Sequence, residues 1–378
     1  MELKENERLV HIFKYGKKEI PVYYDVEKVK DKIEYANTFV ENMLLFFKEN
    51  SLSDTEQKLL FAEESISTSY IEGYENYLPH EKIIEKDGLK SLEEKAVYSG
   101  YVAYTSLYSN KLFNKLDKDE LLKIWRPLVS YKKFFIKNYR KTGVRVGRGL
   151  KTTHFAPSAK YIQNLLDDMF YTLGSYNEEV FDNYGLIKPI LFHYLFTFIH
   201  PFIDGNGRTA RLVEEYLLSE NIGIPYCLPL SSMILQNKKD YYNAFKVVKN
   251  IDNNHLDILS IDLTEFLLYN ISIIVQAASF LLSESQEKGN GYLFYKIFED
   301  YKNKNLENRI EVMLKYIRGL SQGITKNGYK TLWNSITPNG VKITIEDAES
   351  DLNYLLSEGL IIKDERYTLY PGFKYYNK

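Results

Sequence analysis

The chain has 378 residues, with 49 Lys and Arg against 51 Asp and Glu, and 44% of its residues are hydrophobic. This composition is close to that of an average soluble globular protein, which argues against a disordered, collagen-like or coiled-coil chain, and the length suggests two or three domains. The net charge of −2 gives no global reason to bind nucleic acid or an anionic membrane, so such binding would need a local patch.

The single cysteine, Cys227, excludes an intrachain disulfide and a cysteine-based zinc or iron–sulfur site. We expect it to be a small buried hydrophobe in a reducing compartment. The first residues lack the basic-then-apolar order of a secretory signal. The most apolar stretch, residues 263–282, is long enough to cross a bilayer but contains Glu265, Asn270 and Gln276. Because these polar side chains are costly in hydrocarbon, we expect a core helix of a cytoplasmic protein.

Helical periodicity dominates the first two thirds of the chain. Ser53, Ser91 and Asp117 each stand three residues before a Glu, a capping-box pattern that predicts a helix start. The alternating stretch 144–149 predicts a short β-hairpin. The predicted fold is therefore mostly α with one small β flap. Further helices are predicted over residues 26–49, 159–172, 183–199, 207–220, 238–249 and 262–286.

After about residue 286 the chain becomes polar and rich in Gly and Asn, which suggests a connection between domains. A small C-terminal domain is predicted beyond it. Three helices followed by a hairpin resemble a winged-helix domain. The predicted elements are helices over 308–318, about 325–334 and 345–357, and strands over 360–362 and 367–369.

The residues that carry chemistry lie in one run of twelve, from His200 to Arg211. An apolar, helix-like segment precedes this run, and helical periodicity resumes after it at Leu212. Pro201 and the Gly-Asn-Gly sequence at 205–207 force a turn between the two. The arrangement is a helix, a loop and a second helix.

The loop suits an anion. A turn formed by Gly205, Asn206 and Gly207 before a helix start exposes backbone N–H groups at the positive end of the helix dipole, which favours a phosphate. Arg208 and Arg211 are three residues apart and share a helical face, so both guanidinium groups can reach one polyphosphate.

Two more residues complete the constellation. Asp204 supplies a hard oxygen ligand for the Mg²⁺ that accompanies a nucleotide polyphosphate, and His200 can accept a proton near neutral pH, as a general base must. A structural role is the commoner one for a lone histidine, but the joint arrangement favours a site. A second Gly-Asn-Gly, at 289–291, has no histidine before it and is interpreted as a linker turn. His193 lies seven residues from His200, about 10 Å along a helix, too far to share a metal ion.

The run matches at every specified position the signature of the Fic family, His-Pro-Phe-x-Asp/Glu-Gly-Asn-Gly-Arg-x-x-Arg. The resemblance extends to residues 138–147, which look like the flap of that family, to residues 155–157, and to residues 237–242. It covers roughly residues 95–270. A C-terminal winged-helix-like domain also occurs in a subgroup of the family.

The resemblance implies transfer of AMP from ATP to a Tyr, Thr or Ser hydroxyl of a protein, with release of pyrophosphate. His200 would deprotonate the acceptor hydroxyl and Asp204 would hold Mg²⁺, so ATP and Mg²⁺ are the expected cofactors. The flap would bind an extended segment of the target by strand addition. The residues implied for nucleotide binding are Gly205, Asn206, Gly207, Arg208, Arg211, Tyr241 and Tyr242, and those implied for target binding are Val144, Arg145, Val146 and Gly147.

A second motif lies on the helix that follows Ser53. Thr68 and Glu72 are four residues apart on one face, and Gly73 can end the helix. Alone this pattern fits a solvated Glu at a helix end. Beside the Fic signature it resembles the inhibitory motif of the family, Ser/Thr-x-x-x-Glu-Gly/Asn. In that resemblance Glu72 would pair with Arg211 and withdraw it from the γ-phosphate of ATP.

The domains expected are an N-terminal helical region over 1–90 with the inhibitory motif, a Fic core over 91–286 and the winged-helix-like domain over 300–378. The expected partner is a protein with an acceptor hydroxyl; self-modification and a homodimer are further expectations. Alternatives are a related phosphotransfer, removal of AMP at the same site, or a winged-helix regulator that binds DNA. Residues 305–378 carry ten basic and nine acidic side chains, which disfavours DNA binding. The flap region also contains a basic run that suits either an acidic target or a solvated face: Lys132, Lys133, Lys137, Arg140, Lys141, Arg145, Arg148 and Lys151.

Overall fold

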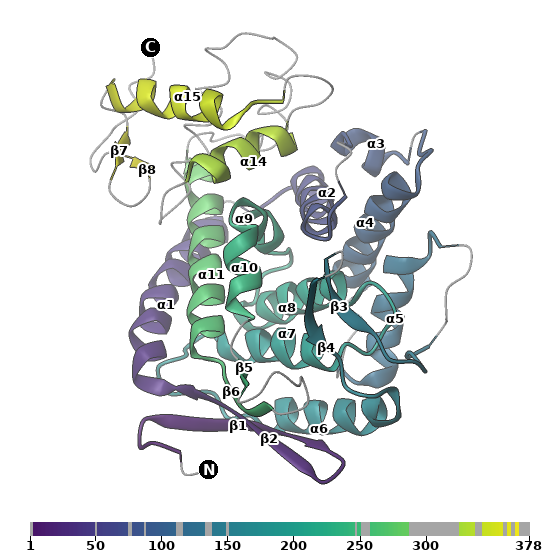
Figure 1. Ribbon diagram of the computed structural model, residues 1–378. Coiled ribbons are helices and arrows are strands. Elements are labelled where there is room, and N and C mark those ends of the chain that lie inside the picture. The colour runs from purple at the N-terminus through teal and green to yellow at the C-terminus, as the bar shows by residue number, and fades with distance from the viewer. Residues whose placement is uncertain are drawn as a thin grey trace.

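The computed structural model is mostly helical, as the sequence predicts, and Figure 1 shows the arrangement of its elements. The helices are α1 (Val26–Glu49), α2 (Asp54–Ile71), α3 (His80–Ile84), α4 (Leu92–Asn110), α5 (Lys118–Val129), α6 (Ile162–Ser175), α7 (Ile187–Ile199), α8 (Asn206–Ile222), α9 (Leu230–Gln236), α10 (Lys238–Ala244), α11 (Thr264–Gln286), α14 (Lys326–Ile336) and α15 (Ile345–Ser357). The structure describes residues 3–49, 51–74, 78–86, 88–110, 116–132, 138–148, 151–245, 248–250, 258–286, 325–336, 342–357, 361–363 and 367–369.

Helices α7 and α8 pack against each other at the centre of the molecule (Figure 1). Of the 13 residues of α7, eleven are buried. A helix that is apolar around its whole circumference is stable only inside a core, and full burial of each large aliphatic or aromatic side chain contributes about 1.5–3 kcal/mol. The loop between α7 and α8 is therefore carried by helices that are packed inside the core.

Helix α11 contains the most apolar stretch of the chain. Its segment Thr264–Leu281 has a mean hydropathy of 1.3, long and apolar enough to cross a membrane, and 72% of that segment is buried inside the protein. The helix packs along α1, and its polar Asn270 and Gln276 are buried with it. Asn270 donates to the carbonyl of Phe266 at 2.8 Å, so the amide is satisfied within the helix. The sequence-based expectation of a core helix agrees with this packing.

Helix caps agree closely with the sequence pattern. Ser53 and Glu56 form the expected capping box at the start of α2, and Ser91 and Glu94 form the one at the start of α4. Asp117 caps α5 by accepting the backbone N–H groups of residues 119 and 120. Because a good N-cap contributes about 1 kcal/mol, these residues help to fix where each helix begins.

Two helix boundaries differ from the expectation by four residues or more. Helix α7 begins at Ile187 rather than near 183, because Gly185 adopts a φ of +58° and the Asp182 carboxylate caps the helix by accepting the N–H groups of residues 186 and 187. The predicted helix over 238–249 is wrong at its end: α10 stops at Ala244 and Val248–Asn250 is a strand. A β-branched residue that finds a strand partner favours extended backbone over a helical end.

A four-stranded sheet, which the sequence did not predict, lies at one edge of the molecule (Figure 1). Its strand order is β1-β2-β6-β5, with β2 and β6 parallel and the other pairs antiparallel. Gly16, with a φ of +67°, turns β1 into β2. The strands are β1 (Glu7–Tyr15), β2 (Lys18–Asp25), β5 (Val248–Asn250) and β6 (Ile258–Asp262).

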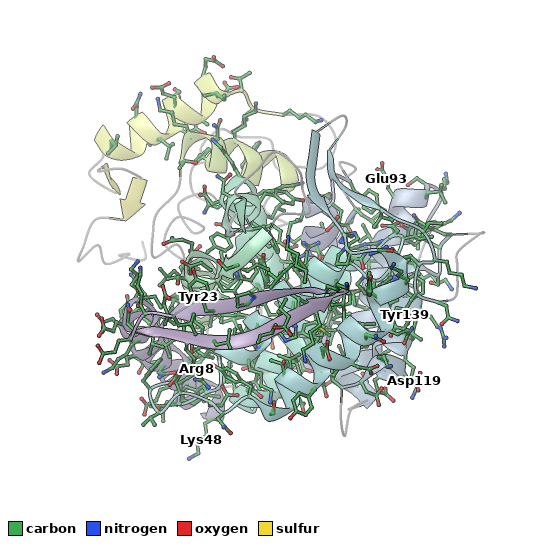
Figure 2. All side chains as sticks on the ribbon, turned by 60° about the horizontal axis from the view of Figure 1, so that its bottom comes forward. Arg8, Tyr23, Lys48, Glu93, Asp119 and Tyr139 are labelled. Carbon is green, nitrogen blue, oxygen red and sulfur yellow. The ribbon has the colours of Figure 1, made fainter. Side chains whose placement is uncertain are left out.

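The β1–β2 hairpin joins the helical core through Arg8. In Figure 2 the hairpin comes forward, with Arg8 and Tyr23 labelled on it. Arg8 forms an ion pair with Glu179 and donates to the carbonyl of Asn177 at 2.6 Å. The Tyr24 hydroxyl also donates to Glu179, at 3.0 Å. The first residues of the region expected to be helical are therefore a hairpin held to the segment after α6.

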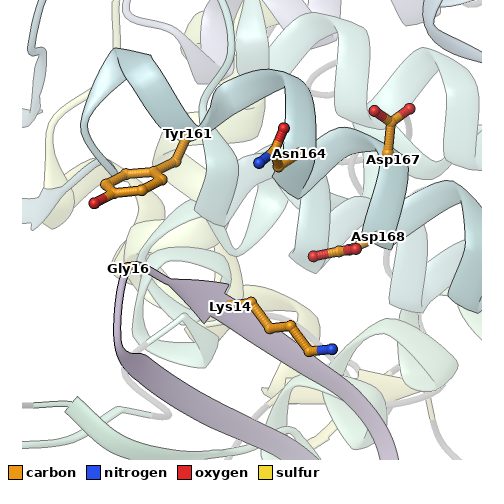
Figure 3. A pocket seen from close by; sticks show the side chains of 6 residues that line it. All are labelled: Lys14, Gly16, Tyr161, Asn164, Asp167 and Asp168. Carbon is orange, nitrogen blue, oxygen red and sulfur yellow. The ribbon is translucent and has the colours of Figure 1, made fainter.

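A hollow lies between the turn of this hairpin and the start of α6 (Figure 3). Lys14, Tyr161 and the carboxylates of Asp167 and Asp168 line it together with Gly16 and Asn164. Lys118 pairs with Asp167 at 2.7 Å. None of the lining residues belongs to the α7–α8 loop.

The predicted flap hairpin is present. Strands β3 (Arg145–Arg148) and β4 (Lys151–Phe155) pair in antiparallel fashion, with Arg145 opposite Phe155 and a register shift between Val146 and Gly147. A short 3₁₀ turn over Ala159–Tyr161 then leads into α6.

The C-terminal elements lie close to where they were expected. Helices α14 and α15 pack together, and strands β7 (Ile361–Lys363) and β8 (Tyr367–Leu369) form a hairpin. Buried Tyr329 on α14 donates to Asp351 on α15 at 2.9 Å. The predicted helix over 308–318 and the predicted linker lie outside the described residues, so the winged-helix assignment stays a prediction.

Helix α2 is held to the core by two buried carboxyl groups. Glu64 on α2 and Glu215 on α8 are both fully buried and hydrogen-bond to each other. Glu64 accepts the backbone N–H groups of Ser231 and Ser232 at 2.7 and 3.0 Å, while Ser231 donates to Glu215 at 2.8 Å. Burial raises the pKa of both groups, and the Glu64 charge raises the pKa of Glu215 further. The raised pKa of Glu215 means that its carboxyl group holds a proton at pH values where an exposed Glu has lost it.

This pair predicts a loss of stability as the pH rises. Above the unfolded pKa of about 4.3 the native state retains a proton that the unfolded chain releases, so the free energy of unfolding falls with increasing pH. We expect Glu215→Gln, which keeps a neutral donor, to raise the melting temperature at about pH 8 by roughly 2–4 °C, equivalent to about 1 kcal/mol. Thermal melts from about pH 5 to about pH 8.5 measure this effect.

Glu220→Gln on the exposed side of the same helix is the matched control and should leave the pH profile unchanged. If Glu215→Gln lost stability with rising pH as steeply as the unmodified chain, the retention of a proton on Glu215 would be contradicted.

Candidate active site

The loop between α7 and α8 depends on two left-handed residues. His200 ends α7 with φ and ψ of 49° and 59°, and its N–H donates to the carbonyl of Phe196 at 2.9 Å. Gly205 precedes α8 with a φ of +82°. A non-glycine residue in this region is uncommon and costs energy, so the surrounding packing must hold His200 there.

That packing centres on Phe202. Its ring stacks on Trp125 of α5 with a centroid distance of 4.1 Å, and on Tyr139 at 5.3 Å. The Trp125 indole N–H also donates to the carbonyl of Asp204 at 2.8 Å. Stacked aromatic contacts contribute about 0.5–1.5 kcal/mol each beyond burial. The predicted loop is therefore fixed by α5, whose role the sequence motif did not reveal.

Asn206 stabilises the loop through its side chain. Its Oδ1 accepts the N–H of Phe202 at 2.9 Å, and its Nδ2 donates to the carbonyl of the same residue at 2.8 Å. The first intrahelical bond of α8 runs from Thr209 to Gly205, so the N–H groups of residues 206–208 have no acceptor within the helix. An anion would bind to these backbone groups rather than to the Asn206 amide.

Asp204 lies beside this helix start and pairs with Lys132. Its other carboxylate oxygen accepts the N–H of Gly205 at 2.6 Å. Burial raises the pKa of Asp204, but Lys132 and the Arg208 charge more than offset this effect, so its pKa lies below the ordinary value. The carboxylate is therefore ionised at neutral pH. Lys132 belongs to the basic run of the sequence, and in the structure it pairs with a carboxylate of the α7–α8 loop.

Arg211 forms several hydrogen bonds at the site, and its side chain is 1% exposed. Its Nη2 pairs with Glu72 Oε1 at 2.5 Å, and its Nε donates to Thr68 Oγ1 at 2.8 Å. Its Nη1 donates to the Tyr241 hydroxyl at 3.1 Å. Thr68 and Glu72, predicted on one face of α2, thus meet the predicted arginine across 143 and 139 positions of sequence.

The Glu72 carboxylate also lies against the start of α8. A Cβ atom at Gly207 would overlap Glu72 Oε1, so any other residue there would require the carboxylate to shift. Glu72 is the C-cap of α2, and Gly73, with a φ of +100°, turns the chain away as expected. An anionic group therefore already occupies the mouth of the predicted anion cradle.

Arg208 leaves α8 in another direction. It donates to the carbonyl of Leu128 at 3.2 Å and to the Tyr131 hydroxyl at 3.3 Å, and its guanidinium lies 5.9 Å from the Tyr74 ring centroid. Tyr74 and Tyr131 are themselves joined through their hydroxyls at 2.9 Å. The two arginines share a helix but are held by different neighbours, a detail that their spacing alone did not specify.

Comparisons with known proteins bear on the same part of the chain. Residues 115–218 match the model of the Fic/DOC family, a range that spans α5, the flap, α7 and most of α8. The chain therefore contains a Fic domain over these residues. A solved structure of a Fic family protein from Desulfovibrio desulfuricans aligns with 91% of this chain and 97% of its own, with a TM-score of 0.55 and 19% identity, which supports the shared fold.

Two curated relatives match parts of the Fic domain. A probable protein adenylyltransferase of Aquifex aeolicus is 33% identical over 129 residues, which are 34% of this chain and 36% of that protein. The protein adenylyltransferase fic-1 of Caenorhabditis elegans is 31% identical over 109 residues, 29% of this chain and 19% of that protein. The chain thus matches 36% of the length of the first relative and 19% of the length of the second.

Arg140 connects the flap of the Fic domain to the loop. Its Nε donates to the carbonyl of His200 at 2.7 Å and its backbone N–H to that of Pro201 at 2.9 Å. Its other guanidinium nitrogens reach the carbonyls of Thr142 and Pro157, at the two ends of the flap. Arg140 is 2% exposed, so neither the target-contacting nor the solvated interpretation of the basic run holds for it.

The flap residues expected to bind a target lie near this junction. The backbone of Arg145, Val146 and Gly147 forms β3, and Val144 precedes it. The side chains of residues 145–155 are outside the described part of the structure. Strand addition along β3 stays a prediction.

Tyr241 and Tyr242 contact the site from α10. Tyr241 is 2% exposed and lies behind Arg211, so it would reach a nucleotide only through that arginine. Tyr242 donates to the carbonyl of Ile71 at 2.9 Å, and Lys238 donates to that of Tyr70 at 2.7 Å. Helix α10 therefore holds the C-terminal end of the helix that carries Glu72.

The residues of the Fic loop fit a magnesium ion whose remaining ligands come from the substrate. Mg²⁺ in nucleotide sites is held by one or two carboxylates together with phosphates and water, and Asp204 is one ionised carboxylate beside the helix start. Among the described residues no three His, Cys, Asp or Glu side chains gather as a closed metal site. Cys227, as expected, is a free and buried thiol.

Proposed function

We propose that the chain is a protein adenylyltransferase that Glu72 holds in an inhibited state. It would transfer AMP from ATP to a Tyr, Thr or Ser hydroxyl of a protein and release pyrophosphate. The complete Fic signature and the relatives named protein adenylyltransferase support this activity. We place the enzyme in the cytoplasm, as the sequence suggests.

The observation that carries the proposal is the position of the Glu72 carboxylate. It lies against Gly207 at the start of α8 and pairs with buried Arg211 at 2.5 Å. A helix N-terminus and a guanidinium form a site for phosphate oxygens, and a carboxylate is the side chain that best imitates one. Glu72 therefore competes with the nucleotide for the same donors.

In the proposed reaction His200 accepts the proton of the target hydroxyl. The hydroxyl oxygen forms a bond to the α-phosphorus while the bond from that phosphorus to the bridging oxygen of pyrophosphate breaks, and pyrophosphate leaves with its electron pair. The backbone N–H groups of residues 206–208 and the guanidinium groups of Arg208 and Arg211 stabilise the negative charge. Phosphoryl transfer depends mainly on such positioning and charge stabilisation.

Asp204 would hold Mg²⁺ after releasing Lys132. The ion, when bound, would neutralise charge on the phosphates. The Asp204 carboxylate is ionised and part-buried, so it meets this requirement without a change of protonation.

We propose that the flap orients the target segment by backbone pairing along β3. Its attachment through Arg140 to His200 would keep the accepted segment and the base in one geometry. The chain itself, in a self-modification, and a second copy, in a homodimer, are proposed partners besides the target.

Parallel incubation with α-labelled and γ-labelled ATP tests the proposed activity. The purified chain is incubated with a cell lysate, and incorporation into protein is measured for each label. Label from α-labelled ATP alone is expected, because AMP carries only the α-phosphate. Label from γ-labelled ATP alone would indicate phosphorylation and contradict the proposal.

For the C-terminal region we expect no appreciable affinity for duplex DNA at physiological salt. Ten basic and nine acidic side chains over 305–378 leave little charge to neutralise phosphates. Titration of a fluorescent random duplex with the full chain measures this. Binding that weakens steeply as the salt concentration rises would overturn the expectation and favour a DNA-binding regulator.

A further inference from the structure

A chain of buried polar groups leads from Arg211 into the core. The Arg211 Nη1 group donates to the Tyr241 hydroxyl at 3.1 Å, and that hydroxyl lies 2.9 Å from Nε2 of His193. Nδ1 of His193 lies 2.5 Å from Oε2 of Glu214. All four side chains are at most 2% exposed. The chain joins α10, α7 and α8, and it includes no residue of α2.

The groups of this chain can be joined by one continuous set of hydrogen bonds. Arg211 can only donate, so the Tyr241 oxygen accepts from it. The Tyr241 hydroxyl can in turn donate to Nε2 of His193, and Nδ1 of His193 can donate to the Glu214 carboxylate. The arrangement is therefore a relay with one cation at one end and one carboxylate at the other.

The opposite charges of Arg211 and Glu214 lower the cost of burying each other. Burying an isolated charge is costly, and neutral hydrogen-bonding groups between two opposite charges are polarised by both. Arg211 and Glu214 are three residues apart on α8, which places them on one helical face. The Glu214 carboxylate therefore balances the Arg211 charge from within the core.

The contacts of Arg211 fall into two groups. Thr68 and Glu72 approach from α2, the helix that carries the inhibitory motif. Tyr241 approaches from α10 and is supported by the relay. We infer that Tyr241, His193 and Glu214 are positioning residues that keep Arg211 oriented toward the terminal phosphate of ATP after Glu72 withdraws. This inference rests on the proposed function for the identity of the nucleotide.

The experiment uses the full chain with Glu72→Gly, so that inhibition does not obscure binding. ATP and ADP are titrated separately by calorimetry in the absence of target, because only ATP carries the phosphate that Arg211 would bind. Tyr241→Phe in this background is expected to weaken ATP binding roughly 10-fold, the effect of losing one charge-assisted hydrogen bond, and to leave ADP binding unchanged.

Tyr226→Phe is the matched control. It removes another buried Tyr hydroxyl, beyond the far end of α8, and is expected to change neither affinity. Glu214→Gln removes the charge at the end of the relay while keeping its shape. It should weaken ATP binding selectively in the same direction, and it serves as the test if Tyr241→Phe melts at a much lower temperature.

The outcomes separate the two proposals. Unchanged ATP affinity in both relay variants, or an equal loss for ATP and ADP, would overturn the positioning role and leave only a structural one. If the Glu72→Gly chain binds ATP more tightly than ADP but transfers no AMP, the proposed function fails and the relay is still decided by the titrations. If Glu72→Gly does not bind ATP more tightly than ADP, the assignment of Arg211 to the terminal phosphate is wrong and the inference falls.

Discussion

Glu72→Gly is expected to raise AMP incorporation, into targets and into the chain itself, by roughly 10- to 150-fold, which corresponds to a clamp of about 1.4–3 kcal/mol. Removing the carboxylate frees the Arg211 guanidinium and clears the space against Gly207. A gain is informative because general damage to the fold lowers activity. Initial rates with α-labelled ATP measure it.

The chain offers a close control. Glu85 is the C-cap of α3 in the same right-handed conformation, with φ and ψ of −85° and −8° against −74° and −6° for Glu72. Glu85→Gly should therefore reproduce the backbone effect without the gain. The double variant Glu72→Gly with Arg211→Ala should lose the gain, since the freed partner is absent. If AMP incorporation in Glu72→Gly were unchanged, inhibition by Glu72 would be contradicted, while the proposed transferase activity would still stand.

His200→Ala is expected to lower AMP transfer by at least about 10²- to 10⁴-fold, the usual contribution of a general base. ATP affinity should remain, because the N–H groups of α8 and the two arginines are untouched by the change. Incorporation from α-labelled ATP and calorimetric titration with ATP are measured side by side, best in the Glu72→Gly background.

A melting temperature recorded on the same sample controls for the fold, because His200 holds a left-handed conformation and its carbonyl accepts from Arg140. Alanine keeps the backbone groups that make these contacts. Loss of ATP binding together with activity would indicate a structural histidine and contradict its role as the base.

Sequence patterns predicted the parts of the fold that depend on interactions between neighbouring residues, such as helix periodicity and helix caps. The bounds of α1 agree with the predicted range to the residue, and the capping box at Ser53 is present. The four-stranded sheet was missed because β5 and β6 are short, β1 lacks strict alternation, and β2 pairs with β6, which lies far along the chain at residues 258–262. Pairing across such a distance leaves no periodic signal in either strand.

The candidate site shows the same division. The signature located His200 and Arg211, and the resemblance paired Arg211 with Glu72, which the geometry agrees with. The contacts of Lys132 with Asp204 and of Tyr241 with His193 have no sequence spacing to predict them. These partners are set by tertiary packing, so only the folded chain identifies them.

The absence of a side chain at Gly207 has a consequence for how this chain could change over generations. A Cβ atom at this position would meet the Glu72 carboxylate, and in the proposed function the same space receives a phosphate. We therefore expect a substitution at position 207 to obstruct the proposed inhibitor and the substrate alike. If Glu72 inhibits as proposed, mutations that relieve inhibition are expected at Glu72, Thr68 and the end of α2, where they leave the phosphate-binding groups of α8 intact.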